Sequence, residues 1–500
     1  MKPREAYAEL LRLAREETVL ASCTDLLEWD EETFMPRGGG DNRAEQMEVL
    51  AGLIHERATS PRYGELLAIV ESSDLVADPL SPAAVNVREL RREYERELKL
   101  PLELVEESAR IGSLASQAWG EAREAGDFRI FAPWLEQLFA IGRLEADAVG
   151  YPETRYDAML EDYEPGMTSA RIDSLFAGLK EELLPLVAER SEPPSVPLHV
   201  LRREFPVDRQ RLFAAAVASG LGFDLEAGRI DEAEHPFCTS LGPGDVRLAV
   251  RYHPRNFASG FFILLHEVGH GLYDQGVDED HYGTPMGEAP SLGFHESQSR
   301  LWENQVGRSP GFWRHFYPRL RNIFHEALHD IPLDTFLQVV NRVAPGPLRS
   351  RADELSYNLH IIIRTELEQA MLDGDLPVAE LPGAWAEAYW RYLGVVPRND
   401  TEGCLQDGHW GEGMIGYFPT YVLGNVYAAQ LFDQAEADLG PLDAAFGRGE
   451  FAGLLGWLRD RIYRQGARYR SADLVAHVTG RAPTPEPLLA SFRRRYGGVS

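Results

Sequence analysis

A long apolar run leads without a break into a short polar motif, which limits how this part of the chain can fold. Residues 257–265 are almost entirely apolar, and the motif His-Glu-Val-Gly-His follows at 266–270. The run predicts a helix that begins in the protein interior. Helical residues four apart lie on the same side, so His266 and His270 face one way. Buried polar side chains need partners, and a metal ion supplies one for both imidazoles.

Two histidines at this spacing form half of a zinc site that hydrolases use. Catalytic zinc takes three protein ligands and leaves a position open for water, and two His plus one carboxylate is a known set. Glu267, between the histidines, can then act as a base toward that water. Chance alone produces the motif in some chains, so the third ligand has to come from elsewhere in the sequence.

The third ligand is expected in the segment 290–300. Ser291 can cap a helix there, and Glu296 falls within the first two turns of that helix. His295 is the rival ligand, but adjacent helical residues point about 100° apart, so only one of the two can face the metal. Glu296 is preferred because it leaves Glu267 free to act as the base.

Composition excludes several classes of protein. The net charge of −29 argues against nucleic acid or an anionic membrane as a partner. The three cysteines, Cys23, Cys238 and Cys404, are widely spaced and indicate neither a disulfide framework nor a cysteine zinc site. The N-terminus lacks the apolar core of a signal peptide, and no run reaches the length of a membrane span. A soluble cytoplasmic protein is expected.

Most of the chain carries helical periodicity. The segments that show it are 4–24, 41–60, 64–73, 86–126, 130–148 and 169–190. Breaks are expected at 35–40 and at the proline-rich stretch 191–197, which is the best candidate boundary. Residues 245–252 alternate apolar and polar side chains, as a short strand would. They lie just before the motif helix, where several zinc peptidases keep a strand that can pair with an extended substrate.

Further motifs follow one another along nearly the whole chain. They are Trp29-Asp30, Met35-Pro36, His235-Pro236-Phe237, Asp245-Val246-Arg247, His295-Glu296-Ser297-Gln298, Leu348-Arg349 with Ala352-Asp353-Glu354, Gly403-Cys404-Leu405-Gln406-Asp407 with His409-Trp410, and 416–425. With the motif at 266–270 and in this order, they resemble the Taq-type thermostable metallocarboxypeptidase family. One departure is Ala249, where the family's Asp-x-Arg-x-Thr motif ends in a threonine that could support the substrate backbone.

The resemblance implies a mainly α fold, built as a single large helical domain over residues 1–500. A deep substrate groove and a small β-sheet beside the zinc helix are expected. Residues 1–190 would form one wall of the groove and residues 198–500 the catalytic portion. The family also implies a homodimer.

The same resemblance implies a zinc-dependent carboxypeptidase that hydrolyses the C-terminal bond of peptides with broad specificity. His266, His270 and Glu296 would be the ligands of one Zn²⁺, which Co²⁺ or Mn²⁺ could replace. A zinc-activated water would attack the carbonyl, with Glu267 as general base and then acid.

Amide hydrolysis also needs a donor for the oxyanion. His409 and Tyr421 are expected in this role, with Tyr417 close behind, because they resemble the His/Tyr arrangement of related helical zinc oligopeptidases.

A carboxypeptidase must also recognise a free terminal carboxylate, which an arginine fork does best. Arg349 is the candidate, because the family's Arg-x-x-Ala-Asp motif falls there. Arg247, next to Asp245 in a second motif, and Arg351 are the alternates. Three further residues are candidates for orienting the site: Asp353, His360 and Gln406.

Two other functions are weighed against this one. A zinc endo-oligopeptidase on the same scaffold would not need a free C-terminus, so amidation of a test peptide separates the two. A peptide-binding protein without activity is the third reading, and the intact set of ligands and base argues against it.

Overall fold

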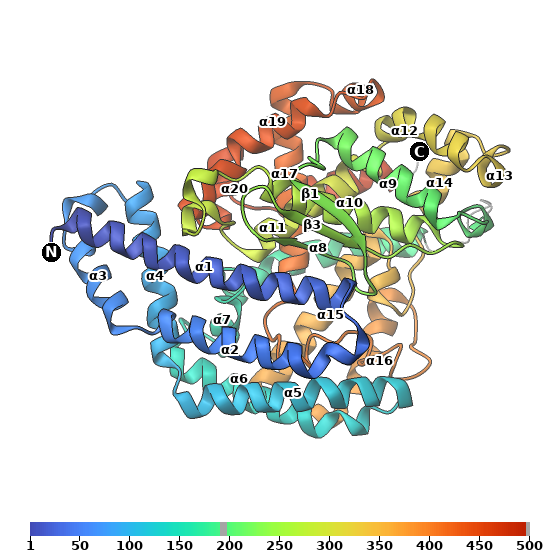
Figure 1. Cartoon of the computed structure of the whole chain (residues 1–500). Helices are drawn as coiled ribbons and strands as arrows, with labels where there is room; N and C mark the ends of the chain where they lie inside the picture. The colour runs from blue at the N-terminus through green and yellow to red at the C-terminus, as the bar shows by residue number, and fades with distance from the viewer. Residues whose placement is uncertain (191–197, 497–500) are drawn as a thin grey trace.

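The computed structural model describes residues 1–190 and 198–496 and is mainly helical (Figure 1). The α-helices before the sheet are α1 (Pro3–Thr33), α2 (Gly40–Ala58), α3 (Pro61–Glu71), α4 (Pro82–Lys99), α5 (Leu102–Ala125), α6 (Ala132–Val149), α7 (Arg155–Leu160), α8 (Ser169–Arg190) and α9 (Val207–Leu221). Those after it are α10 (Phe257–Asp274), α11 (Leu292–Arg300), α12 (Pro310–Ile323), α13 (His325–Leu328), α14 (Leu333–Val340), α15 (Glu354–Asp373), α16 (Leu381–Leu393), α17 (Pro419–Leu439), α18 (Leu442–Gly447), α19 (Ala452–Arg461), α20 (Ser471–Thr479) and α21 (Glu486–Tyr496). None of the helices in the described ranges has both the length and the apolar content needed to cross a bilayer.

Proline and glycine set helix boundaries in the N-terminal part. The segment 86–126, which carries unbroken helical periodicity, contains two helices, because α4 ends at Lys99 and α5 begins at Leu102. Pro101 lies at the break and caps α5; it has no N–H to donate and disfavours helical backbone in the residue before it. The expected break at 35–40 is confirmed by the gap between α1 and α2. The proposed boundary at 191–197 lies outside the described residues.

The N-terminal helices have a small core of their own. Helices α1, α3 and α4 pack together, and α2 runs beside α1 (Figure 1). The main core extends from Ile111 in α5 to Tyr496 in α21. Hydrogen bonds join α4 to the C-terminal part of the chain: the Arg88 guanidinium donates to the Ala467 carbonyl at 2.7 Å, and the Met286 N–H donates to the Asn86 side chain at 3.0 Å.

A three-stranded sheet lies against α10, the helix that carries the motif. Its strands are β1 (Gly228–Glu232), β2 (Phe237–Ser240) and β3 (Val246–Val250), in the order β1-β3-β2. Strand β3 pairs in parallel with β1 and antiparallel with β2. A strand within 245–252 is thus confirmed, and so is the mainly α fold class with a small sheet. Both edges of β3 are hydrogen-bonded to neighbouring strands, so it differs from the zinc-peptidase strands that can pair with an extended substrate.

Candidate metal centre

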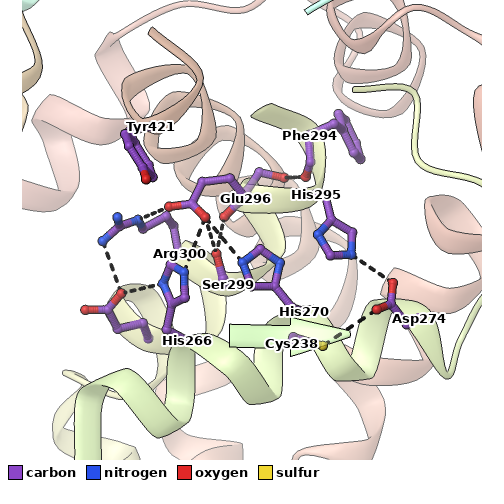
Figure 2. A network of polar contacts seen from close by, with 12 residues as sticks. Cys238, His266, His270, Asp274, Phe294, His295, Glu296, Ser299, Arg300 and Tyr421 are labelled. Carbon is purple, nitrogen blue, oxygen red and sulfur yellow. Dashed lines mark hydrogen bonds and ion pairs between the residues drawn. The ribbon is translucent and has the colours of Figure 1, made fainter. Parts of the chain in front are cut away.

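Helix α10 presents both histidines of the motif from the protein interior. The side chain of Asn256 caps the helix and accepts a hydrogen bond from the Ser259 N–H at 3.5 Å. The residues around the histidines are apolar and buried, so the two imidazoles emerge on one face. Figure 2 shows His266 and His270 extending from α10 toward Glu296.

Three donor atoms converge between α10 and α11. The Nε2 atoms of His266 and His270 each lie 3.3 Å from the Oε2 atom of Glu296. One ligand atom from each of the three residues lies within 4.8 Å of the others, which is close enough for a single metal ion to bridge them. Two imidazoles and one carboxylate suit zinc, and several other divalent ions as well.

The second ring nitrogen of His266 shows that this imidazole is oriented for ligation. Its Nδ1 atom lies 3.1 Å from the Oε2 atom of Glu303. A proton on Nδ1 that donates to this carboxylate leaves the lone pair of Nε2 directed at Glu296. Carboxylates commonly orient metal-binding histidines in this way and make them more basic. The residues present therefore fit a divalent metal ion.

Glu296 is held in place by its own helix. The Arg300 Nε atom donates to Oε1 at 2.7 Å, and the Ser299 hydroxyl donates to Oε2 at 3.1 Å (Figure 2). Burial alone would raise the pKa of Glu296, but His266 and Arg300 outweigh it and hold that pKa well below its usual value. The carboxylate therefore stays ionised, which is the form that binds a metal.

A π-helical turn, η7 (Leu301–Val306), follows α11 and carries Glu303. Its wider backbone is seen in the bond from the Gly307 N–H to the Trp302 carbonyl, five residues back, at 2.9 Å. Within this geometry Glu303 also accepts a hydrogen bond from Arg300 at 3.2 Å. Such turns often occur at functional sites, and this one places a carboxylate behind His266.

Glu267, between the two motif histidines in the sequence, is a buried carboxyl group with a shifted pKa. The residue is 6% exposed, and burial, only partly offset by His266, raises its pKa to about 7. A carboxyl group whose pKa lies near neutrality can both accept a proton and return it.

His295 points away from the three converging donors. Its Nε2 atom lies 2.8 Å from the Oδ1 atom of Asp274, and its ring stacks on that of His270 with centroids 4.5 Å apart (Figure 2). The geometry therefore places Glu296, and not His295, in the cluster with the two motif histidines.

His409, Tyr417 and Tyr421 meet at the start of α17. The His409 Nε2 atom lies 3.4 Å from the Tyr421 hydroxyl, and the two tyrosine rings are 5.3 Å apart. Burial lowers the pKa of His409 to about 3 and raises that of Tyr417 to about 12. The histidine is therefore neutral and the tyrosine remains a donor. Tyr421 points toward Glu296 and Arg300 (Figure 2).

Arg349 is joined to the cluster through a shared tyrosine. Its guanidinium binds Asp407 through Nε and Nη2, with a shortest distance of 2.8 Å. Its Nη1 atom donates to the Tyr357 hydroxyl at 3.2 Å, and the same oxygen accepts a bond from Arg300 at 2.6 Å. Tyr357 thus bridges Arg349 to the arginine that holds Glu296.

Comparison with known proteins agrees with this geometry. The family model described as Carboxypeptidase Taq (M32) metallopeptidase matches residues 9–496. The chain belongs to this M32 family. It is 48% identical over 511 residues to thermostable carboxypeptidase 1 of Thermus thermophilus, with 100% of both chains covered. Its fold matches the M32 carboxypeptidase of Deinococcus radiodurans with a TM-score of 0.95, at 39% identity and with 99% of each chain covered.

A second solved structure, metallocarboxypeptidase 1 of Trypanosoma cruzi, matches with a TM-score of 0.93 at 34% identity. The match covers 99% of this chain and 100% of the other. The predicted family and the predicted enzyme class, a metallocarboxypeptidase acting on peptides, are confirmed.

In this M32 carboxypeptidase, Asp245 and Arg247 connect the sheet to the N-terminal helices. Arg247 donates two hydrogen bonds of 2.8 Å to Asp245, and its guanidinium lies 4.2 Å from the ring centroid of Trp29 in α1. Within the described residues, no hydrogen bond or ion pair joins either residue to the metal cluster. Ala249, on the same strand, is fully buried.

Gln406 and His360 lie behind Arg349. The Gln406 side chain accepts the Arg349 N–H at 2.7 Å and donates to the Tyr389 hydroxyl at 3.2 Å. That hydroxyl lies 2.8 Å from the Nδ1 atom of His360. Gln406 therefore contacts the predicted carboxylate-binding arginine directly, and His360 lies two contacts further away, beyond Tyr389.

Within residues 1–190 and 198–496, neither Asp353 nor Arg351 makes a hydrogen bond or ion pair with the metal cluster. The Asp353 carboxylate caps α15 by accepting the N–H groups of Leu355 and Ser356 at 3.1 and 3.0 Å. Arg351 is exposed at the end of a short 3-10 turn.

Three residues of the site were missed by sequence reasoning: Arg300, Glu303 and Tyr357. The first two follow Glu296 by four and seven positions, a spacing that would have placed them on its helical face. Tyr357 carries no comparable signal, because it comes from a different helix.

Proposed function

We propose that this enzyme is a zinc carboxypeptidase in which His266, His270 and Glu296 hold one Zn²⁺. The observation that supports this most directly is the convergence of three ligand atoms, with Glu303 orienting one imidazole. Co²⁺ or Mn²⁺ would also fit the donor set. Zinc, when bound, polarises the scissile carbonyl and lowers the pKa of a water to about 7.

In this proposal Glu267 is the general base and then the general acid. Its carboxylate accepts a proton from the attacking water and returns the proton to the leaving amine. Burial of Glu267 favours this role, because it brings the pKa of the carboxyl to about 7.

Tyr421 and His409 are the proposed donors to the oxyanion, with Tyr417 next to them. Burial raises the pKa of Tyr421 well above its usual value, so its hydroxyl keeps its proton. Its direction toward Glu296 places that hydroxyl near the metal cluster (Figure 2). Donors that are fixed in place before the reaction stabilise developing negative charge without reorganisation.

Arg349 is the proposed anchor for the terminal carboxylate of the peptide. Its chain of contacts through Tyr357 to Arg300 keeps the guanidinium next to the metal cluster. Arg247, paired with Asp245, would contact a more distant part of the substrate, and exposed Arg351 is the weakest alternate. Recognition of the main chain and its end, not of a side chain, gives the broad specificity that we propose.

We further propose the larger features that the family resemblance implies. Residues 1–190 would form one wall of a deep groove, with residues 198–500 as the catalytic portion. The enzyme would act as a homodimer in the cytoplasm.

Mass spectrometry of one unstructured peptide tests the function. The peptide is supplied with a free or an amidated C-terminus to the zinc-loaded enzyme and to Glu267→Gln. We expect a ladder of single C-terminal losses from the free peptide only, and none from the variant. Internal cuts in both peptides would instead support a zinc endo-oligopeptidase, the alternative function. No cleavage with metal bound would indicate a peptide-binding protein.

A further inference from the structure

Arg364 in α15 is a fully buried cation. Its exposure is 0%, and its guanidinium lies between the rings of Trp410 and Phe418, at 3.5 and 4.2 Å from their centroids. Within the described residues, its Nε and both Nη atoms have no hydrogen-bond partner. A guanidinium carries five N–H groups, and leaving them unpaired in the interior is costly. Stacking on two rings offsets only part of that cost.

The nearest carboxylate on the same helix is already occupied. Glu368, one turn after Arg364, accepts hydrogen bonds from Trp410 at 2.6 Å, from Tyr156 at 2.9 Å and from the Gly416 N–H at 2.7 Å. These three donors satisfy the carboxylate without Arg364.

The other nearby carboxylate, Asp407, is held by Arg349. Both of its oxygens accept hydrogen bonds from that guanidinium, and the residue is only 8% exposed. Burial opposes ionisation of Asp407, but the positive charges of Arg349 and then Arg364 lower its pKa below the usual value. Asp407 is therefore an anion within electrostatic reach of two arginines, and only one of them binds it directly.

A bound peptide changes this balance. If Arg349 grips the terminal carboxylate, its fork is no longer fully available to Asp407. Asp407 is too buried to turn to solvent, and an unpaired buried charge is strongly unfavourable. Arg364 and Arg349 both lie against the ring of Phe418, with guanidinium carbons 4.2 and 5.4 Å from its centroid, so the unpaired N–H groups of Arg364 lie beside the Arg349–Asp407 pair.

We propose that Arg364 is a positioning residue that takes over Asp407 when Arg349 turns to the carboxylate of the substrate. The inference rests on the proposed role of Arg349. Without substrate two arginines lie near one aspartate, which only Arg349 binds; with substrate each arginine has its own carboxylate. Arg364 thus adds to the preference for a free C-terminus without contacting the peptide.

Binding measurements on the zinc-loaded Glu267→Gln enzyme test this exchange. Dissociation constants are compared for one short peptide with a free C-terminus and for its amide, and their ratio measures recognition of the carboxylate. Arg364→Met should lower that ratio about 10-fold, the scale of a charge-assisted hydrogen bond, and leave the affinity for the amide nearly unchanged. Arg364→Lys should restore part of it. Arg143→Met is the control, because Arg143 contacts the end of the same helix at Met371.

Asp407→Asn keeps the proposal testable if Arg364→Met does not fold. With Asp407 neutral, Arg349 is free, so the ratio should be maintained or rise and should no longer depend on residue 364. A folded Arg364→Met with an unchanged ratio, or loss of the ratio in Asp407→Asn, would overturn the exchange. Retention of the ratio in Arg349→Met would instead overturn the proposed role of Arg349.

Discussion

Gly269 of α10 packs directly against Ser299 of α11. A Cβ atom on Gly269 would lie 2.5 Å from the Ser299 Cα atom and 2.7 Å from the Gln298 carbonyl oxygen. Both contacts are with backbone, which cannot move aside as a flexible side chain can. Because α10 carries two residues of the metal cluster and α11 carries the third, this contact sets the separation across the site.

Gly269→Ala should therefore push α10 and α11 apart. We expect a loss of about 1–3 kcal/mol in the free energy of unfolding, as in other overpacked interiors, and weaker metal binding. Denaturant unfolding and metal titration of the chelator-treated protein measure the two effects. Gly120→Ala in α5 is the control, because open space surrounds that position and alanine favours a helix by up to about 1 kcal/mol. Equal stability of Gly269→Ala and the wild type would contradict the argument.

Glu303→Gln tests how much the orientation of a ligand contributes to metal affinity, compared with loss of a ligand itself. We expect metal affinity about 10- to 100-fold weaker, because His266 loses the carboxylate that orients it. Glu296→Gln should release the metal almost completely, because a ligand itself is altered. Competition with a chelator gives both affinities, and Glu279→Gln is the control. If Glu303→Gln binds metal as the wild type does, Glu303 does not orient the site.

Tyr421→Phe tests the proposed oxyanion donor. Loss of one donor that acts in the transition state should lower kcat by about 100- to 1,000-fold with little change in KM. Tyr417→Phe should have a smaller effect if Tyr421 is the main donor, and Tyr151→Phe serves as the control at an exposed tyrosine. A large effect for Tyr417→Phe alone would exchange the two roles.

Glu17 in α1 predicts a pH dependence of stability outside the metal site. Burial, with the charges of Glu93 and Glu97, raises its pKa from 4.5 to about 7. Because the pKa of Glu17 is higher in the folded than in the unfolded protein, its protonation stabilises the fold fully below pH 4.5. This contribution to the free energy of unfolding is lost as the pH rises through about 7. Glu17→Gln should therefore be more stable than the wild type at pH 8, by less than about 1 kcal/mol because Glu17 is partly exposed. The gain should vanish near pH 4.5.

Urea unfolding at both pH values measures this difference. Glu45→Gln, at an exposed position in α2, is the matched control. A stability gain of the same size at both pH values would show that ionisation of Glu17 is not its cause.

Much of the site could be predicted from local spacing, and the rest depends on contacts between distant elements. Helical periodicity was enough to place His266 and His270 together and to put Glu296 on a second helix. It could not decide between Glu296 and His295, because that choice depends on Asp274, which binds the His295 ring. Tyr357, which bridges Arg349 and Arg300, lies on a different element from either arginine, so no local sequence pattern predicts the contact.

The parts of the fold that could not be predicted from the sequence also have physical explanations. The stretch 86–126 looks like one helix because both halves share the period, and only Pro101 divides it. Strand β1 reads Gly-Arg-Ile-Asp-Glu and β2 reads Phe-Cys-Thr-Ser, so neither shows the alternation of apolar and polar side chains that marks β3. Whether β3 lies at an edge or in the centre depends on which neighbours it finds in the folded protein.

The π-helical turn η7 has a consequence for related sequences of different length. A turn of this kind holds one residue more than an α-helical turn, so deleting one residue within 301–306 would give an unbroken α-helix. Positions beyond the turn would keep their orientation, because an α-helical turn needs one residue fewer, but the positions inside 301–306 would shift relative to Glu296. The segment would then be a regular α-helix, yet the carboxylate of Glu303 would no longer face His266. A relative with a single-residue gap here must therefore orient that histidine by other means, even if all three predicted ligands align.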